Sequence, residues 1–139
     1  MAVATHLVDT SAWARYGRPE VRSRLQPLVE SGRVATCSVI DLELLFSSRT
    51  AVEHQRIRLE RAGFERLSFE QADCDRAEEV QSLLASQGKT RAVGIADLLL
   101  AATAERHRVL LLHYDHDFDV IAAITGQKVD WVVPAGSVP

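Results

Sequence analysis

The sequence predicts an α/β domain in which helices cover both faces of a central, mostly parallel sheet. Short strand-like runs alternate with longer helical segments, which is the order that parallel strands and their crossover helices require. The run Val109-Leu110-Leu111-Leu112 has no polar residue, as expected of a strand buried on both faces. A chain of 139 residues has room for one domain, which we expect to span residues 1–139.

The N-terminal half of the chain predicts three strands and the helices between them. His6-Leu7-Val8 favours a strand, and the following Asp9-Thr10-Ser11 has side chains suited to a helix N-cap. Pro19 suits the first turn of a second helix, which Gly32 would end. A strand, an apolar helix, a charged helix and a weak strand follow, over Arg33–Cys37, Ser38 to about Ser48, Ala51–Ala62 and Glu65–Phe69.

The C-terminal half predicts three helices and two strands. Gln71–Ser86 has the periodicity of an amphipathic helix, and a polar loop follows it over residues 87–91. Ile95–Arg106 is a strongly apolar helix, and a helix that is apolar nearly all round is expected to be buried. The last elements are a buried strand, a helix and a strand, over Val109–His113, Phe118–Thr125 and Val129–Val133.

Composition narrows the class of protein. Apolar residues make up 47% of the chain and charged residues 25%, which is typical of a globular domain, and the net charge of −3 by itself disfavours nucleic-acid binding. Met1–His6 lacks the features of a signal segment, and no run approaches the ~18 apolar residues of a membrane span. Cys37 and Cys74 have no metal-ligand spacing and are typical of buried thiols in a reducing compartment. We therefore expect a cytoplasmic protein with no membrane segment.

Carboxylates stand at four places where the local pattern predicts apolar or neutral residues. Asp9 directly follows the first strand; a helix cap is one interpretation, but Thr10 and Ser11 would cap equally well. Asp97 lies in the first turn of the most apolar helix, where an acid also interacts favourably with the helix dipole. Because a buried carboxylate must be paired or bound to a cation, we interpret Asp97 as functional.

The third place is the apolar helix that begins near Ser38. Glu43 lies on the side of this helix that Val39 and Phe46 share, and Asp41 is turned about 160° away from it. We expect one of the two acids to be solvated and the other to emerge beside apolar neighbours. An ordinary position at the helix margin is the alternative interpretation of Glu43.

The fourth place is the segment His113-Tyr114-Asp115-His116-Asp117-Phe118-Asp119, directly after a buried strand. Asp115 or Asp117 is expected to cap the next helix, yet acids crowded at one strand end repel each other unless something cationic neutralises them. His113 and His116 lack an i+4 partner or a cysteine pair, so we expect partly exposed polar residues rather than metal ligands.

A parallel sheet would bring these acidic segments together. The carboxyl ends of parallel strands meet at one edge of the sheet, where ligands bind. The segments at Asp9, Glu43 and Asp115 follow three of the predicted strands, and Asp97 opens the helix that leads into the fourth strand. An all-carboxylate cluster suits Mg²⁺ or Mn²⁺ rather than zinc, and it indicates metal-assisted attack on a phosphoryl group.

Four segments of the chain resemble the acidic motifs of PIN-domain ribonucleases, and among these the VapC toxins of bacterial toxin–antitoxin modules. They are Val8-Asp9-Thr10-Ser11-Ala12, Ile40-Asp41-Leu42-Glu43-Leu44, Ile95-Ala96-Asp97-Leu98-Leu99 and Asp115-His116-Asp117-Phe118. Their order, approximate spacing and the chain length also agree. The resemblance implies a three-layer α/β/α fold and an endoribonuclease that depends on Mg²⁺, with Mn²⁺ as a substitute. It further implies cleavage of structured RNA such as tRNA to 5′-phosphate and 3′-hydroxyl ends, a cognate VapB antitoxin and a homodimer.

The resemblance also implies which residues form the site. Asp117 is an additional or alternative member of the catalytic and metal-binding set, and whether it or Asp115 is the closer ligand stays open. Thr10 or Ser11 falls where the family has a small hydroxyl residue near the metal. The family's acidic positions fall on Asp9, Glu43, Asp97 and Asp115.

Basic and aromatic residues would have to hold RNA against this acidic site. Arg15, Lys89 and Arg91 are candidates for phosphate contacts, although surface arginines are often simply solvated. Trp13 and Tyr16 are candidates for stacking on unpaired bases, although such side chains are more often packed. Without the five candidate acids the chain has 14 acidic and 16 basic residues, and 14 of those 16 are arginines, which bind phosphate well.

Two other functions fit the sequence less well than a ribonuclease. A phospho-receiver domain would need a pair of acids after the first strand and a lysine after the last, whereas Asp9 stands alone and Val129–Val133 leads to Pro134. A catalytically silent PIN fold that only binds RNA or protein is the remaining alternative, and the full set of acids argues against it.

Overall fold

A single parallel sheet lies at the centre of the molecule. The structure, a computed structural model, describes residues 3–139, so Met1 and Ala2 of the expected domain lie outside the described residues. Within this range five strands pair in the order β3-β2-β1-β4-β5, and every pair is parallel. Their bounds are β1 His6–Val8, β2 Val34–Thr36, β3 Glu65–Arg66, β4 Leu110–His113 and β5 Val129–Trp131.

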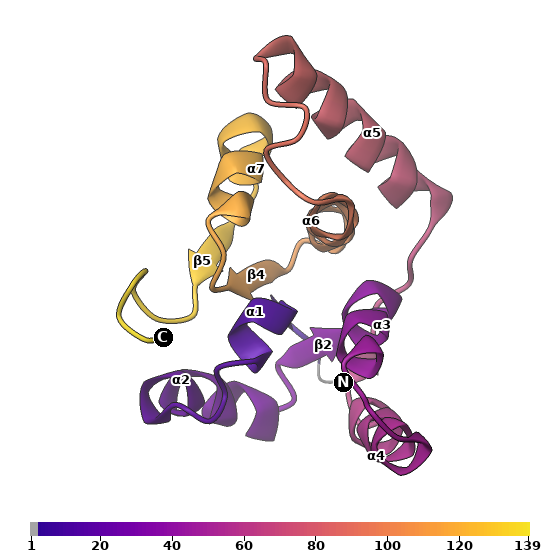
Figure 1. The fold of residues 1–139 in the computed structure, drawn as a ribbon, viewed down its shortest axis with the longest axis vertical. Coiled ribbons are helices and arrows are strands. Elements are labelled where there is room, and N and C mark those ends of the chain that lie inside the picture. The colour runs from indigo at the N-terminus through magenta and orange to yellow at the C-terminus, as the bar shows by residue number, and fades with distance from the viewer. Residues whose placement is uncertain (1–2) are drawn as a thin grey trace.

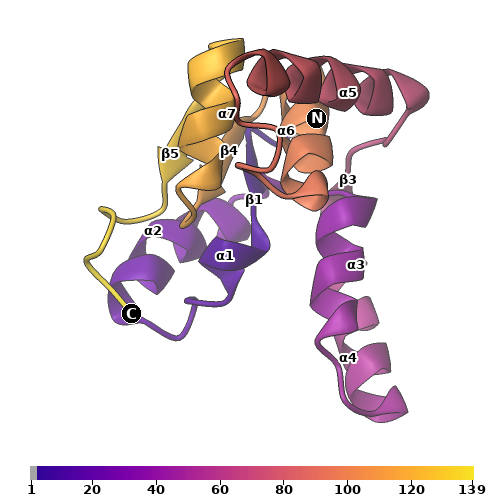
Figure 2. The same ribbon diagram turned by 45° about the horizontal axis from the view of Figure 1, so that its top comes forward.

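Helices cover both faces of this sheet, so the predicted three-layer α/β/α fold is confirmed. Figure 1 shows α1 and α2 on one side of the strands and α5, α6 and α7 on the other. In Figure 2, α3 and α4 extend away from the sheet. The helices in residues 3–139 are α1 Thr10–Trp13, α2 Pro19–Glu30, α3 Ser38–Phe46, α4 Ala51–Arg61, α5 Gln71–Ser86, α6 Ile95–His107 and α7 Asp117–Thr125.

Both ends of α3 differ from the sequence prediction. The predicted cap Ser38 is the first residue of α3, and the backbone of Cys37 takes the extended N-cap conformation before it. The same helix ends at Phe46 rather than near Ser48, because the amide of Ser47 already bonds to Leu44 as a cap. Both differences are of the one or two residues by which helix termini fray.

Alternate residues of the strands supply two apolar cores. Successive side chains of a strand point to opposite faces of the sheet, so the central strands contribute to both. On one face, strand residues pack with buried residues of α3, α5, α6 and α7, and on the other they pack with α1 and α2. The first core contains Leu7, Ala35 and Leu111, and the second contains Val8, Val34 and Leu112. The buried helix α6 belongs to the first core, as its apolar sequence predicts.

The strand order places a crevice beside β1 and β4. The chain winds outward from β1 to β2 and β3, and then crosses to β4 and β5 on the other side of β1. Ligands bind where the winding direction reverses, at the carboxyl ends of the two central strands. Val8 is level with Leu112, and the amide of Asp9 donates to the Leu112 carbonyl at 2.9 Å. Asp9 therefore enters this crevice beside the segment that follows β4.

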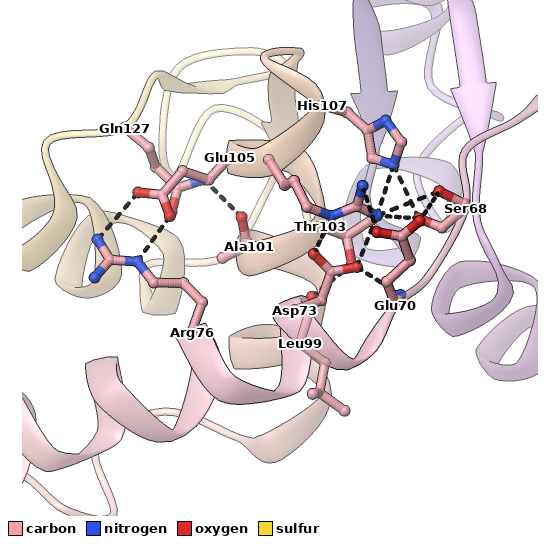
Figure 3. A network of polar contacts seen from close by, with 11 residues as sticks. Ser68, Glu70, Asp73, Arg76, Leu99, Ala101, Thr103, Glu105, His107 and Gln127 are labelled. Carbon is pink, nitrogen blue, oxygen red and sulfur yellow. Dashed lines mark hydrogen bonds and ion pairs between the residues drawn. The ribbon is translucent and has the colours of Figure 1, made fainter.

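Ion pairs join α5 to α6 on the outer layer of the molecule. The Arg106 guanidinium donates to both carboxylate oxygens of Asp73, at 2.7 and 3.0 Å. Figure 3 shows Asp73 among Ser68, Glu70 and His107, and the amide of Glu70 also donates to Asp73 at 2.9 Å. Burial alone would raise the pKa of Asp73, but hydrogen bonds from Arg106 and from the Glu70 backbone lower it on balance.

Two further expectations from the sequence concern the cysteines and membrane-spanning helices. Cys37 is buried, Cys74 is half-buried, and neither forms a disulfide. From Val3 to Pro139, no helix combines the length and the apolar character that crossing a membrane would take.

We predict that Asp73→Ala lowers the free energy of unfolding by about 2 kcal/mol, between the values of exposed and fully buried pairs. Because the pKa of Asp73 is lowered, its stabilisation is present at neutral pH and is lost as the pH falls below ~4. Urea denaturation at pH 7 and pH 3 measures both effects. Glu79→Ala, which removes an exposed partner of Arg76, is the control and should cost less than about 0.5 kcal/mol. Equal losses in the two variants would contradict the prediction.

Candidate metal centre

Three of the predicted acids converge at the crevice. Asp97 comes from the first turn of α6, and Asp115 and Asp117 come from the segment after β4. Each offers one carboxylate oxygen, and these oxygens all lie within 4.8 Å of one another. The three residues are half-buried, so their charges are only partly screened by water.

Asp9 both caps a helix and presents an unpartnered oxygen. Its side chain is 2% exposed, and its Oδ2 accepts a hydrogen bond from the Ser11 amide at 2.9 Å, which caps α1. Its Oδ1 is buried and has no hydrogen-bond partner in residues 3–139. Burial raises the pKa of Asp9, and the charge of Asp115 raises it further. A buried carboxylate oxygen without a donor is costly unless a cation satisfies it.

Asp97 carries the strongest electrostatic perturbation of the site. Burial, followed by the charges of Asp9, Asp115 and Asp117 and a hydrogen bond with Asp117, raises the pKa of Asp97 to about 8. Like charges this close cannot all ionise at neutral pH without a counter-ion. In the absence of a cation, the cluster therefore retains a proton at neutral pH.

Glu43 in α3 also responds to these acids. Burial raises the pKa of Glu43, the charge of Asp9 adds to the shift, and Glu43 Oε1 is buried without a partner among the described residues. Asp41 is buried as well, at 6% exposed, and forms ion pairs with Arg61 and Arg66. The expectation that one acid of this helix is solvated is therefore wrong, because the two arginines, distant in sequence, neutralise Asp41 inside the protein.

The segment after β4 is held by hydrogen bonds to its backbone. Asp115 Oδ1 accepts from the Asp117 amide at 2.9 Å, so Asp115 is the acid that fixes the start of α7. Ser11 Oγ accepts from the Tyr114 amide at 2.8 Å and so ties α1 to this segment. Thr10, the other hydroxyl candidate, is half-buried at the start of α1. The carboxylate of Asp115 is thus positioned by a local backbone contact.

The two histidines of this segment differ. His116 is 77% exposed, as expected. His113 is wholly buried between the rings of Phe118 and Trp131, and its Nδ1 accepts from the Asp115 amide at 3.2 Å. The expectation that His113 is partly exposed is wrong, because it is the last residue of a fully buried strand. Burial lowers the pKa of His113, so its neutral form is favoured. Its position at the end of Val109-Leu110-Leu111-Leu112 is the sequence signal for this burial.

The candidate RNA-binding residues lie in different surroundings. Arg15 donates to the carbonyls of Ser11 and Pro139, at 2.8 and 3.0 Å, and its guanidinium lies 4.3 Å from the centre of the Tyr114 ring. Lys89 and Arg91 are exposed in the loop before α6. Trp13 and Tyr16 pack against each other, and both line an apolar cavity of about 390 Å³ together with Leu44, Ile57 and Phe64.

The acids fit a hard divalent cation. The donors are all carboxylates, three of their oxygens lie close together, and Asp9 and Glu43 add two buried oxygens without partners. Oxygen donors of this kind suit Mg²⁺ or Mn²⁺. Asp97, Asp115 and Asp117 would hold the ion. Asp9 lies close enough for its charge to raise the pKa of Asp97, and the same charge adds to the raised pKa of Glu43.

Most of the chain matches a family of known proteins. The family model described as PIN domain matches residues 6–124, a stretch that contains all five acids. The chain belongs to the PIN-domain family. Within this family, Ribonuclease VapC51 of Mycobacterium tuberculosis (strain ATCC 25618 / H37Rv) is 43% identical over 133 residues, 96% of each chain. Ribonuclease VapC21 of the same strain is 42% identical over 133 residues, 95% of this chain and 96% of its own.

Solved structures of VapBC complexes share the PIN fold. A DNA-bound VapBC from Salmonella typhimurium has a TM-score of 0.73 at 17% identity, covering 94% of this chain and 100% of that chain. VapBC-5 from Mycobacterium tuberculosis has a TM-score of 0.67 at 20% identity, covering 91% of this chain and 98% of that chain. At such identities the likeness shows the fold alone.

We predict that the cation-free PIN domain loses stability as the pH rises from ~4 towards 8. Because the pKa of Asp97 is raised to about 8, the folded chain keeps a proton that the unfolded chain releases above ~4. Asp97→Asn should reduce this dependence, because the smaller contributions of Asp9 and Glu43 remain, and should be more stable than the wild type by at least about 1 kcal/mol at pH 8 in chelator. Thermal and urea denaturation at pH 6 and pH 8 measure it.

The control for this prediction is Asp75→Asn, which changes an exposed carboxylate of α5. Added Mg²⁺ should stabilise the wild type and the Asp75→Asn protein more than Asp97→Asn, since a ligand stabilises the state that binds it. A pH dependence in Asp97→Asn as large as in the wild type would contradict the prediction.

Proposed function

We propose that this PIN-domain protein is the ribonuclease toxin of a VapBC pair and cleaves structured RNA, tRNA foremost, with Mg²⁺ or Mn²⁺ as cofactor. The convergence of Asp97, Asp115 and Asp117 within 4.8 Å carries the metal dependence. Identity above 40% to two VapC ribonucleases over nearly the whole chain supports RNA as the substrate. The free thiols of Cys37 and Cys74 agree with action in the cytoplasm, where tRNA is found.

The chemistry is hydrolysis of a phosphodiester. When bound, Mg²⁺ or Mn²⁺ would lower the pKa of water and provide positive charge beside the phosphoryl oxygens. Water adds to phosphorus, the bond to the 3′-oxygen breaks, and the products carry 5′-phosphate and 3′-hydroxyl ends. One proton of the water passes to a carboxylate of the cluster, because no separate general base is evident near it among residues 3–139, and the leaving 3′-oxygen takes up a proton from solvent.

The acids of the chain have different tasks in this proposal. Asp97, Asp115 and Asp117 hold the cation, and Asp9 and Glu43 orient water with their unpartnered oxygens. Ser11 acts by positioning, because its hydroxyl already accepts from the Tyr114 amide. Lys89 and Arg91, exposed in the loop before Asp97, contact neighbouring phosphates.

A VapB-type antitoxin is the proposed partner. The solved relatives are VapBC complexes, and the apolar cavity lined by Trp13, Tyr16 and Phe64 offers an aromatic surface suited to an apolar protein segment. We assign Trp13 and Tyr16 to this contact rather than to base stacking, since their rings already pack on protein.

A homodimer is the proposed assembly. Phe46, the last residue of α3, is 92% exposed. A large apolar side chain this exposed is typical of an interaction surface. A second copy of the chain would cover Phe46 and would bring two metal centres into one particle.

We predict that the purified chain cleaves total tRNA when Mg²⁺ or Mn²⁺ is present and not when a chelator is present. Asp97→Asn should reduce the rate at least about a hundredfold, because it removes a ligand charge from the cluster. Gel analysis of end-labelled tRNA measures the rate, and phosphatase sensitivity identifies the 5′-phosphate. Asp75→Asn is the matched surface control. Cleavage without metal, or full activity of Asp97→Asn, would contradict the mechanism, and binding without cleavage would indicate the silent module instead.

We predict that Phe46→Ser weakens the homodimer. Light scattering of the wild type at micromolar concentration should give twice 15.4 kDa, and the variant should shift towards 15.4 kDa because the exposed apolar ring is lost. Val52→Ser, which changes an 82% exposed residue of α4, serves as the control. A wild-type mass of one chain would refute the dimer, and a dimeric Phe46→Ser would refute this face.

A further inference from the structure

A polar cavity lies on the other side of α3 from Glu43. It has a volume of about 480 Å³ and is formed by α3, the end of α4 and β3. Its charged lining consists of Arg58, Arg61, Arg66 and Asp41, and Leu42 and Leu45 provide an apolar wall. We refer to it as the arginine cavity. The ribonuclease mechanism proposed above makes no use of it.

Positive charge exceeds negative charge in the arginine cavity. One carboxylate serves two guanidinium groups: Arg61 donates to Asp41 at 3.1 Å, and Arg66 donates to the other oxygen of Asp41. Arg58 is exposed and forms no ion pair with any other side chain of residues 3–139. Two of the three arginine charges therefore have no carboxylate to balance them inside the cavity.

Arg61 is built into the wall of this cavity. Its side chain is 8% exposed, and besides Asp41 it donates to Thr36 Oγ1 at 3.0 Å. It also lies over the rings of Phe64 and Trp13, at 4.4 and 5.1 Å from their centres. Burial lowers the pKa of Arg61, and its bond to Asp41 only partly offsets this, so a further anion nearby would stabilise its charge. Because these contacts hold Arg61, its guanidinium is already in position before a ligand binds.

The chemistry of the arginine cavity fits a nucleotide. Guanidinium groups match phosphate oxygens with paired hydrogen bonds, and arginine is preferred to lysine for this contact. Leu42 and Leu45 give a flat apolar wall against which a base or ribose would lie. The volume falls within the range of ~300–1,000 Å³ for small-molecule sites, which exceeds the need of a bare phosphate ion.

The arginine cavity is close to the metal centre. Asp41 faces it, while Glu43, two residues later and about 160° around the same helix, faces the acidic cluster. The two sites are therefore separated by about the diameter of one helix, ~10–12 Å. A strand of RNA that crosses the metal centre would reach this cavity with a nucleotide outside the cleaved bond.

We propose that the arginine cavity binds one nucleotide of the RNA substrate outside the scissile position, with its phosphate on Arg58 and Arg66 and its sugar or base against Leu42 and Leu45. This rests on the proposed ribonuclease function. The cavity strengthens RNA binding and fixes the position of the RNA strand relative to the metal centre. It takes no part in bond cleavage.

We predict that Arg58→Gln weakens RNA binding about fivefold at low salt and lowers the slope of log affinity against log salt by about one, since one phosphate contact is lost. Fluorescence anisotropy with labelled tRNA in chelator measures binding without any cleavage, so a failed ribonuclease assay leaves this test intact. Cleavage kinetics with Mg²⁺ should show a raised KM and an unchanged kcat.

The matched control is Arg56→Gln on the same helix, because Arg56 pairs with Glu60 at 2.9 Å and does not line the cavity. Equal losses of RNA affinity in the two variants would show that the effect comes from general surface charge, and this would overturn the proposal. No loss in either variant would overturn it as well. In a further arm, adenosine monophosphate at millimolar concentration should compete with tRNA for the wild type and less for Arg58→Gln. Nucleotide binding that depends on Arg58 while tRNA binding does not would identify a free nucleotide as the ligand and overturn the RNA assignment.

Discussion

Mutual repulsion among carboxylates is the constraint on which the rest of this structure depends. Parallel strands β1 and β4 bring acids to one point, where burial and then the charges of Asp9, Asp115 and Asp117 raise the pKa of Asp97 to about 8. The backbone holds them there: Asp9 caps α1, Asp115 fixes the start of α7, and Ser11 ties these two regions together. Asp9 and Asp115 are positioned by amide donors rather than by basic side chains, which leaves the other oxygen of each free for a cation. A lysine or arginine at this point would neutralise the acids permanently.

The helix α3 shows how two acids on one helix take opposite roles. Asp41 is bound on one side by Arg61, Arg66 and Thr36, which fixes the rotation of the helix about its axis. Glu43, about 160° away, is thereby turned towards the metal centre with Oε1 unpartnered. Replacement of Asp41 would leave a buried arginine without its counter-charge, so its cost would exceed the loss of one hydrogen bond.

The fold and the acidic set were predictable from the sequence because both depend on local patterns. Apolar runs of the right length indicated buried strands, and acids directly after them indicated the edge where the strands end. The partners of Asp41 were not predictable, because Arg61 and Arg66 lie 20 and 25 residues away and approach only through the α3–α4 turn and β3. His113 was misjudged for a similar reason: residue type suggested exposure, while its place at the end of β4 decided burial. Tertiary contacts, rather than propensity, set both outcomes.

Under the proposed function, a chain of net charge −3 acts on a polyanion, and its distribution of charge is compatible with this. Asp97, Asp115 and Asp117 are concentrated at one crevice, where a bound divalent cation would reverse their effect on an approaching phosphate. Behind α3, arginines outnumber acids three to one in the arginine cavity. In the proposed complex an RNA strand would use both surfaces, because a phosphate at the acidic cluster would be repelled until a cation binds, whereas neighbouring phosphates would be attracted by the guanidinium groups. Attraction at the flank would therefore keep substrate near an acidic centre that cannot attract it alone.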